Sequence, residues 1–240
     1  MYQKNENQFI ENCRKFKIEI NEFQMNQFRI YYQMLIEWNE NVNLTAITEY
    51  DEVLVKHFLD SIALCAYTDL SKKKKIIDIG TGAGFPGIPL KIIFPELQVT
   101  LLDSLNKRVL FLNTVIEKLR LDNMETVHVR AEDLARDKNY REKYDFSVSR
   151  AVANLSTLNE LCLPFVKEKG YFVSYKSEKA DMEIENAKRS IKLLGGIMEH
   201  KYEYILPETD INRTLIFIKK TKKCPALYPR KAGTPTKNPL

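Results

Sequence analysis

The sequence predicts an α/β fold in which a seven-stranded, mostly parallel sheet follows an N-terminal helical extension. From Lys74 onward, short runs rich in β-branched and aromatic residues alternate with helical patterns, which is typical of a doubly wound parallel sheet. Only residues 207–213 join the last two runs. This link is too short for a crossover helix, so the two strands should form an antiparallel hairpin at the sheet edge.

Residues 1–70 are predicted to be helical. Apolar and aromatic side chains recur at three- and four-residue steps between Phe28 and Trp38, which is the periodicity of one buried helix face. A shorter helix is predicted around residues 9–16 and a further one over residues 51–67. Because the segment is short and has no internal repeat, we interpret it as a helical extension rather than as a separate domain.

The central domain is predicted to cover residues 71–222. Its strands are expected at 75–80, 98–103, 126–129, 144–149, 171–176, 198–206 and 214–220. Its helices are expected at 88–94, 105–121, 154–166 and 179–194. Parallel β-α units closed by one hairpin account for all seven strands.

Residues 223–240 form a predicted basic, proline-rich C-terminal tail. Eight Lys or Arg residues and no Asp or Glu lie from Arg213 to the end, whereas the whole chain has a net charge of +5. This excess is typical of a nucleic-acid-binding segment and equally of a solvated, disordered tail. The four prolines between residues 225 and 240 predict an absence of regular structure.

The composition excludes several classes of protein. No window approaches the roughly 18 consecutive apolar residues of a membrane helix, and the N-terminus MYQKNENQ lacks a signal-peptide pattern. The four cysteines are dispersed, without a C-x-x-C pair or a histidine at ligand spacing. We therefore expect no membrane association, no metal and no disulfide framework, and a cytoplasmic location. The sequence requires nothing larger than a monomer.

The segment GTGAGFPGIP (80–89) directly follows a predicted strand and is typical of a nucleotide-binding turn. Gly82 and Gly87 have the spacing of a phosphate-binding P-loop, but isoleucine and proline follow where that motif needs lysine and a hydroxyl. The same two glycines also match the dinucleotide fingerprint G-x-G-x-x-G, with Asp103 at the end of the next strand. These features fit NAD and S-adenosylmethionine equally well.

Three further features favour S-adenosylmethionine as the cofactor. The glycine series begins earlier, at Gly80, and Asp78 precedes it; in this D-x-G-x-G-x-G form the loop backbone meets the amino-acid end of the methyl donor. Pro86 and Pro89 remove N–H donors that a pyrophosphate would need at a helix N-terminus. The third strand ends in Ala131-Glu132, an acceptor suited to the adenine amine, although a helix N-terminus also favours such an acid.

Several motifs between residues 38 and 240 are shared with one known family. They are Trp38-Asn39 with Asn43-Leu44-Thr45, His57 with Asp60-Ser61, DIGTGAGFPGIPLK, LLDS with Lys107-Arg108, Arg130-Ala131-Glu132, Ser149-Arg150-Ala151, Tyr175-Lys176 and YPRKAGTPTKNPL. Through them the chain resembles the bacterial ribosomal small-subunit methyltransferase G family, formerly glucose-inhibited division protein B. The resemblance implies a class I, Rossmann-like S-adenosylmethionine-dependent methyltransferase that methylates N7 of a guanosine in the decoding-region loop of 16S rRNA.

The predicted cofactor site combines the residue pattern with this resemblance. Asp103, with Ser104 beside it, should bind the ribose, while the resemblance adds Phe85 and Arg150. The predicted cofactor-binding residues are Gly80, Gly82, Phe85, Asp103, Ser104, Ala131, Glu132 and Arg150.

The sequence also narrows the acceptor atom. Enzymes that methylate exocyclic amines commonly carry [DNS]-P-P-[YF] after the fourth strand, where this chain has SRAV (149–152). Cys162 lies in an apolar helical pattern and Cys224 in the tail, so neither is placed as a nucleophile for pyrimidine C5. A ring nitrogen with a free lone pair, such as guanine N7, fits both absences. It needs positioning rather than a general base, so no acid–base residue is assigned.

Arg150 and Lys176 end the fourth and fifth strands, where ligands of such sheets bind. We expect Arg150 to order the donor pocket and Lys176 to help hold the RNA, unless either only pairs with a surface acid. His57 is expected to be a structural hydrogen-bonding residue. The RNA-binding candidates are Lys176, Arg213, Tyr228, Arg230 and Lys231.

Two other functions remain open from the sequence. One is a non-catalytic rRNA-binding assembly factor that keeps a methyltransferase fold. The other is an NAD-dependent oxidoreductase, which only the G-x-G-x-x-G pattern and Asp103 support.

Overall fold

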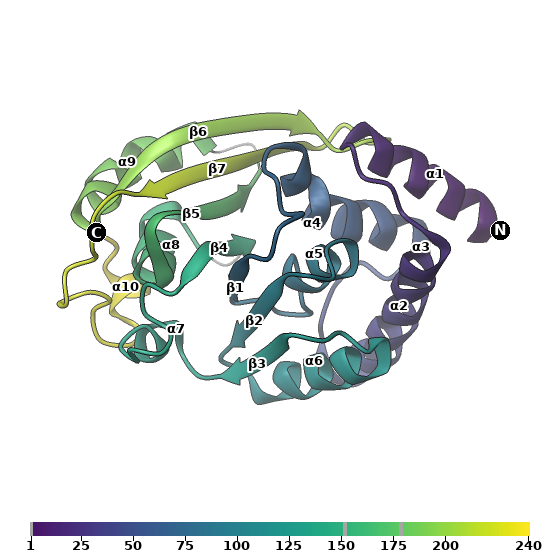
Figure 1. Ribbon diagram of the computed structural model, residues 1–240, viewed down its shortest axis with the longest axis horizontal. Helices are drawn as coiled ribbons and strands as arrows, with labels where there is room; N and C mark the ends of the chain where they lie inside the picture. Colours follow the sequence, from purple (N-terminus) through teal and green to yellow (C-terminus); the bar gives the residue numbers. More distant parts are fainter. Residues whose placement is uncertain (1, 151–152, 178–179) are drawn as a thin grey trace.

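One seven-stranded sheet forms the centre of the protein (Figure 1). The computed structural model describes residues 2–150, 153–177 and 180–240. The strands are β1 (Lys75–Ile79), β2 (Gln98–Asp103), β3 (Met124–His128), β4 (Tyr144–Arg150), β5 (Val166–Lys176), β6 (Gly196–Ile205) and β7 (Asn212–Lys220). All seven predicted strands are present, and β5 begins earlier than predicted because Val166 already pairs with Tyr144, beyond a register shift.

The strand order is β3-β2-β1-β4-β5-β7-β6. The first five strands in this order are parallel, while β7 is antiparallel to both β5 and β6. The predicted edge hairpin is therefore confirmed, and β7 inserts between β5 and β6. Asp78 on β1 lies opposite Leu101 on β2 and Val148 on β4. The chain winds away from β1 in both directions, so the loop after β1 stands at the switch point where such sheets bind ligands.

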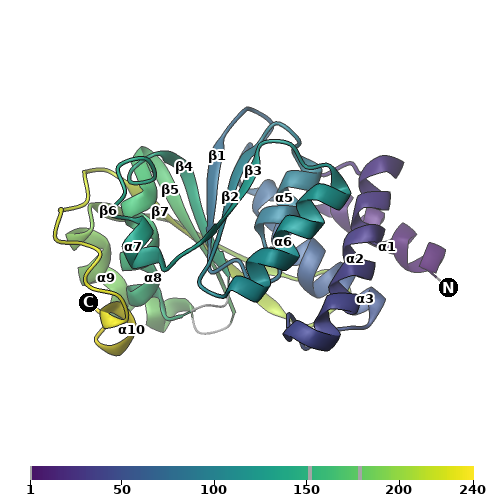
Figure 2. The same cartoon turned by 90° about the horizontal axis from the view of Figure 1, so that it is seen from below.

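Helices cover both faces of the sheet and bury a separate apolar cluster on each (Figures 1 and 2). One face carries α1 (Tyr2–Lys15), α2 (Glu22–Val42), α5 (Gly87–Ile93) and α6 (Asn106–Leu119). The other face carries α7 (Ala131–Leu134), α8 (Leu155–Cys162), the 3₁₀ turn η3 (Leu163–Phe165), α9 (Ala180–Leu193) and α10 (Thr234–Lys237). The alternating layers confirm the predicted doubly wound architecture.

The long helix α2 has clear start and stop signals. The Asn21 side chain caps the N-terminus by accepting from the Gln24 amide, and the Gln24 side chain accepts from the Asn21 amide, which is a capping box. The helix ends at Asn43, whose φ of 50° lies in the left-handed region. Phe28 and Tyr31, from the predicted apolar stripe, are fully buried. The helical extension therefore packs on the sheet as part of the same core.

The helix predicted over residues 51–67 is present as one uninterrupted helical run, whose type changes along its length. It consists of α3 (Tyr50–Val53), the π-helix η1 (Leu54–Leu59), α4 (Asp60–Ile62) and the 3₁₀-helix η2 (Ala63–Ala66). In η1 the carbonyl oxygens of Lys56 and His57 accept hydrogen bonds from Arg150 Nη1 at 3.2 and 3.5 Å. π-Turns frequently occur at functional sites. A distant arginine thus binds the backbone here, which apolar periodicity could not reveal.

The C-terminal tail is folded, contrary to the predicted absence of regular structure. It contains the short helix α10 and lies across α7 and α8 (Figure 2). The guanidinium of Arg141 donates to the carbonyl oxygens of Cys224 and Tyr228 at 2.9 Å each. Proline prevents long helices, but the side chains of the domain satisfy the carbonyls of an irregular chain equally well.

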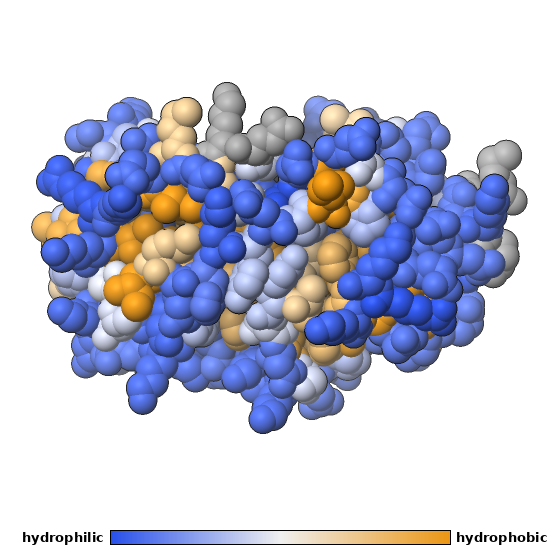
Figure 3. Space-filling model, turned by 90° about the horizontal axis from the view of Figure 1, so that it is seen from above, coloured by the Kyte–Doolittle hydropathy of each residue, from blue (hydrophilic) through white to orange (hydrophobic). Residues whose placement is uncertain are grey.

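In the described residues no helix has the length and apolar character needed to cross a membrane. Figure 3 shows the surface above β6 and β7, where hydrophobic side chains form separate small groups among hydrophilic ones. Exposed Ile197 and Ile205 on β6 belong to this edge strand. Scattered groups of this kind are ordinary for a protein surface.

Candidate active site

The glycine loop turns the chain sharply between β1 and α5. Gly80, Gly82 and Gly84 have φ values of 68°, 61° and 100°, a left-handed conformation that glycine adopts without steric cost. At Gly84 a Cβ atom would also lie 2.5 Å from Ile88 Cδ1 and 2.7 Å from the Tyr31 hydroxyl. The alternating glycines therefore let the loop backbone approach the helical extension.

Asp78 holds this loop from the end of β1. Its Oδ2 accepts hydrogen bonds from the Gly87 amide and the Thr81 hydroxyl, both at 2.8 Å. Its buried Oδ1 has no partner in the described part of the chain. Burial raises the pKa of this carboxyl to about 7. A protein acceptor already occupies the first amide of α5, while the second carboxylate oxygen is buried without a hydrogen-bond donor in the described residues.

Asp103 lies next to the loop, at the end of β2. Its Oδ2 accepts from the Gly82 amide at 3.0 Å and its Oδ1 from the Leu105 amide at 2.9 Å. Ser104 is exposed, and its carbonyl oxygen lies 3.1 Å from His128 Nε2. The predicted ribose-binding acid is thus brought to the glycine loop, 21 residues away in the sequence.

Ala131 and Glu132 begin the short helix α7 after β3, and both are buried. The Oε1 atom of Glu132 accepts a hydrogen bond from the Gly233 amide at 2.8 Å. No pattern in the sequence predicted this contact with the tail. The carboxylates of Asp78, Asp103 and Glu132 therefore stand at the carboxyl ends of three neighbouring strands, on the edge where the glycine loop lies.

Phe85 is nearly buried under the loop and packs between two groups from distant parts of the chain. The His57 ring stacks on it with a centroid distance of 4.7 Å, and the Arg150 guanidinium lies 5.0 Å from the ring centroid. Arginine over an aromatic face is a favourable cation–π arrangement. Phe85 and Arg150, both predicted to bind the cofactor, are therefore in direct contact.

Asp60 holds Arg150 in this position. The Oδ2 atom of Asp60 lies 3.1 Å from Arg150 Nη1, while its Oδ1 accepts from the Tyr204 hydroxyl at 3.0 Å and from Arg213 Nε at 3.2 Å. The carboxylate is only 3% exposed, so its three donors offset the cost of burying the charge. Sequence reasoning did not assign Asp60 a role; its place in the motif HFLDS was the available signal.

His57 is a neutral hydrogen-bonding residue in this arrangement, as the sequence predicted. Burial and the neighbouring charge of Arg150 lower its pKa to about 3. Nδ1 lies 3.4 Å from Arg150 Nη2 and Nε2 lies 2.7 Å from the Thr45 hydroxyl. A neutral ring that accepts from the guanidinium through Nδ1 carries its proton on Nε2.

A cleft of about 460 Å³ opens beside Arg150. Its charged lining residues are Lys56, Asp60, Arg150, Lys176, Glu183 and Arg213. They come from η1, α4, α9 and the ends of three strands, so the fold gathers distant charges into one place. The predicted RNA-binding residues Lys176 and Arg213 both lie here.

The other RNA-binding candidates have internal partners or lie on the tail. Lys176 Nζ lies 2.7 Å from Glu183 Oε2, and its side chain is 9% exposed. Arg230 forms several hydrogen bonds to the fully buried Glu160, the shortest of them at 2.6 Å from its own amide. Tyr228 is half-buried and Lys231 is exposed. RNA binding by these residues stays a prediction. The SRAV segment also includes Ala151 and Val152, which lie outside the described residues, as does Lys179.

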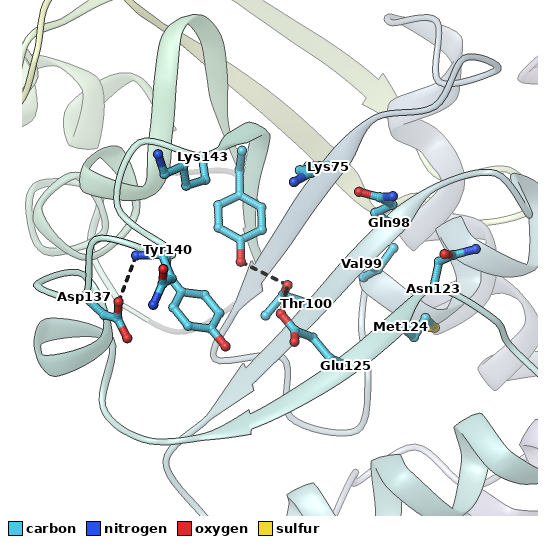
Figure 4. A pocket seen from close by; sticks show the side chains of 12 residues that line it. Lys75, Gln98, Val99, Thr100, Asn123, Met124, Glu125, Asp137, Tyr140 and Lys143 are labelled. Carbon is cyan, nitrogen blue, oxygen red and sulfur yellow. Dashed lines mark hydrogen bonds between the residues drawn. The ribbon is translucent and has the colours of Figure 1, made fainter.

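A second cavity, of about 610 Å³, lies at the amino ends of the parallel strands, opposite the ends that carry the glycine loop (Figure 4). It is lined by Lys75 and Gln98, the first residues of β1 and β2, and Tyr140 from the loop after α7 stands across from them. Thr100 Oγ1 bonds to Glu125 at 2.8 Å on its floor. Asp137, Asn139 and Lys143 from the loop after α7 also line the cavity. The cavity is separate from the glycine loop, which follows the other end of β1.

Solved structures share the fold at low sequence identity. TrmN from Thermus thermophilus has a TM-score of 0.54 and 15% identity, covering 70% of this chain and 53% of TrmN. TYW2 from M. jannaschii, in complex with AdoMet, has a TM-score of 0.51 and 15% identity, covering 62% of this chain and 70% of TYW2. Together with the sheet, these likenesses confirm the predicted class I methyltransferase fold.

Sequence relatives are much closer. A family model described as rRNA small subunit methyltransferase G matches residues 24–210. The protein named ribosomal RNA small subunit methyltransferase G of Lachnoclostridium phytofermentans is 53% identical, over 97% of this chain and 96% of its own length. The protein of the same name from Staphylococcus saprophyticus is 54% identical over 93% of each chain. The chain therefore belongs to the rRNA small subunit methyltransferase G family.

Proposed function

We propose that this protein transfers a methyl group from S-adenosylmethionine to N7 of a guanosine in the decoding-region loop of 16S rRNA. One observation carries the proposal: in a chain of this family, Asp78, Asp103 and Glu132 lie around a left-handed glycine loop at the switch point of the sheet. The proposed partner is 16S rRNA or the small ribosomal subunit. We further propose that the protein acts as a cytoplasmic monomer.

The residues at the loop fit this methyl donor. S-adenosylmethionine supplies a methyl group on a sulfonium cation and carries an ammonium, a ribose and an adenine, but no phosphate. The unpartnered Oδ1 of Asp78 is an acceptor suited to a cationic ligand. Asp103 can accept from ribose hydroxyls at the end of β2, and Glu132 from the adenine amine at the end of β3. The α5 amide that could bind a phosphate is already bonded to Asp78, which disfavours a dinucleotide.

The cleft beside Arg150 supports guanosine as the acceptor. Guanine N7 has a free lone pair, so the enzyme must hold it in line with the methyl group and needs no general base. Arg213 and Lys176 offer positive charge for RNA phosphates at the cleft. Methylation at N7 leaves a cationic base, and the Asp60 and Glu183 carboxylates that also line the cleft would offset this charge. We propose Arg150 and Lys176 as positioning residues.

The test is a methyl-transfer assay with mass mapping. The protein is incubated with isotope-labelled S-adenosylmethionine and, in parallel, with naked 16S rRNA and with small subunits that lack the modification. We expect one labelled 7-methylguanosine in the decoding-region loop in at least one of the two substrates. Donor binding by calorimetry without any labelled nucleotide would instead identify a non-catalytic assembly factor, and a label on another atom would contradict the assigned acceptor.

A further inference from the structure

We infer that the folded C-terminal tail positions the adenine side of the donor pocket, through a hydrogen bond between the Gly233 amide and the Glu132 carboxylate. The inference rests on the proposed function, because it concerns how the same pocket recognises its donor. It assigns the tail a role in donor binding, separate from the RNA contacts that its positive charge suggested.

The tail is anchored at a buried ion pair. Glu160 on α8 has no exposed surface, and Arg230 Nη2 lies 2.7 Å from its Oε2 while Arg230 Nε lies 2.9 Å from its Oε1. Two parallel contacts between a guanidinium and a carboxylate fix orientation as well as distance. The Thr157 hydroxyl donates to the Pro235 carbonyl at 3.0 Å on the other side. The residues between these two anchors, 231–234, are therefore held in place over α7 and α8.

Gly233 lies between the two anchors and faces the donor site. Its amide donates to Glu132 Oε1 at 2.8 Å, and Glu132 is only 6% exposed. No donor reaches the other oxygen, Oε2, among residues 2–150, 153–177 and 180–240. The tail bond therefore restrains the carboxylate rotation and leaves one oxygen free to accept from an adenine amine.

The conformation of Gly233 provides a selective way to disturb this bond. Its φ is 81°, and a Cβ atom there would meet no heavy atom within 4 Å. A substitution thus acts through the backbone and not through a clash. Valine, which is β-branched, strongly disfavours this conformation, alanine disfavours it less, and asparagine tolerates it. Gly233→Val and Gly233→Ala should displace the amide, while Gly233→Asn is the matched control.

The experiment measures the affinity of the full-length protein for two ligands. These are S-adenosylhomocysteine and S-inosylhomocysteine, in which an oxygen replaces the adenine amine. In Gly233→Val we expect affinity for the adenine compound to fall roughly tenfold, with little change for the hypoxanthine compound. Gly233→Ala should show a smaller selective loss and Gly233→Asn none. Thermal unfolding of each variant identifies any that fail to fold.

The outcomes separate the inference from the proposed function. An equal loss for both ligands in Gly233→Val and Gly233→Ala, or no loss in either folded variant, would overturn the positioning role of the tail. A wild-type protein that binds neither S-adenosylmethionine nor S-adenosylhomocysteine would overturn the proposed function itself. If Gly233→Val fails to fold, the selectivity of Gly233→Ala against Gly233→Asn decides the matter.

Discussion

The two flanks of the proposed donor pocket are held by opposite ends of the chain and by different forces. On the glycine-loop side, Tyr31 from α2 is fully buried, stacks on Phe58 at 5.2 Å and donates to the Ala83 carbonyl. On the adenine side, the tail holds Glu132 through one amide and is itself held by polar contacts such as Arg230 with Glu160. Apolar packing dominates the first flank and hydrogen bonding the second.

This difference predicts how each flank responds to change. Apolar packing against the main core couples the loop to global stability, because removing a buried ring leaves a cavity. Each hydrogen bond of the C-terminal tail contributes less to the free energy of unfolding, but together these bonds orient a single carboxylate, that of Glu132. Damage to the first flank should unfold the protein, whereas damage to the second should change ligand recognition in a folded protein.

The largest expected effect is on stability, from Tyr31→Ala. The substitution removes a fully buried ring that also contacts Phe85 at 5.6 Å. We expect the free energy of unfolding to fall by about 3–5 kcal/mol, measured by urea denaturation. Tyr31→Phe, which removes only the hydroxyl, should cost about 1 kcal/mol. Similar losses in the two variants would show that the hydrogen bond, and not the packing, stabilises this flank.

Next in size is the effect of Arg150→Ala on donor binding. This side chain covers Phe85 and bonds Asp60, so its loss should weaken S-adenosylmethionine binding by about 2 kcal/mol, roughly 30-fold. Lys176→Ala, on the neighbouring strand β5, should leave donor affinity unchanged and lower methyl transfer. Calorimetry and a transfer assay separate the two effects. Unchanged activity in both variants would remove these residues from the site.

The pH dependence of stability should reveal two opposing groups on the glycine-loop flank. The pKa of His57 is lowered to about 3 by burial and by Arg150, so the unfolded chain binds the extra proton below pH ~6.5 and stability falls as pH falls. The pKa of Asp78 is raised to about 7 by burial, so the folded chain binds the extra proton above pH ~3.8 and stability falls as pH rises.

Between about pH 4 and 6.5 the two slopes, each about 1.4 kcal/mol per pH unit, should largely cancel. In His57→Gln, unfolding free energy should therefore decrease with pH across this window. In Asp78→Asn it should increase with pH. Urea denaturation at several pH values in this window measures both slopes. Parallel pH profiles in the two variants would contradict the assigned protonation states.

The smallest expected effect concerns RNA. Lys231 and Lys237 are exposed on the C-terminal tail, the segment that holds Glu132. Replacing both with alanine should leave the unfolding free energy within about 0.5 kcal/mol and reduce the salt dependence of RNA binding by about one phosphate contact for each lysine. Lys72 and Lys73, near the amino end of β1, are the matched controls. An equal change in the control pair would indicate only non-specific attraction.

Much of the fold was predictable because its signals are local. The alternation of β-rich and helical runs marked every strand, and the glycines after Asp78 marked the turn that needs left-handed residues. The helix over residues 51–67 was predictable, but its π-helical turn was not, because the carbonyls of that turn bind Arg150, far along the chain. The folded tail was missed for the same reason: Glu160, the partner of Arg230, lies 70 residues before it.

The sequence by itself determined the fold class, the position of the glycine loop and the acidic residues around it. Periodicity, turn residues and strand ends are properties of neighbouring residues, and short-range sterics and burial dictate them. Only the tertiary structure decided which candidate side chains were already paired. Lys176 and Arg230 were RNA-binding candidates in the sequence, but partners from other elements bind both, Glu183 and Glu160 respectively. A buried charge without a partner is strongly destabilising, so these side chains pair with a carboxylate. Which carboxylate lies within reach depends on the tertiary fold.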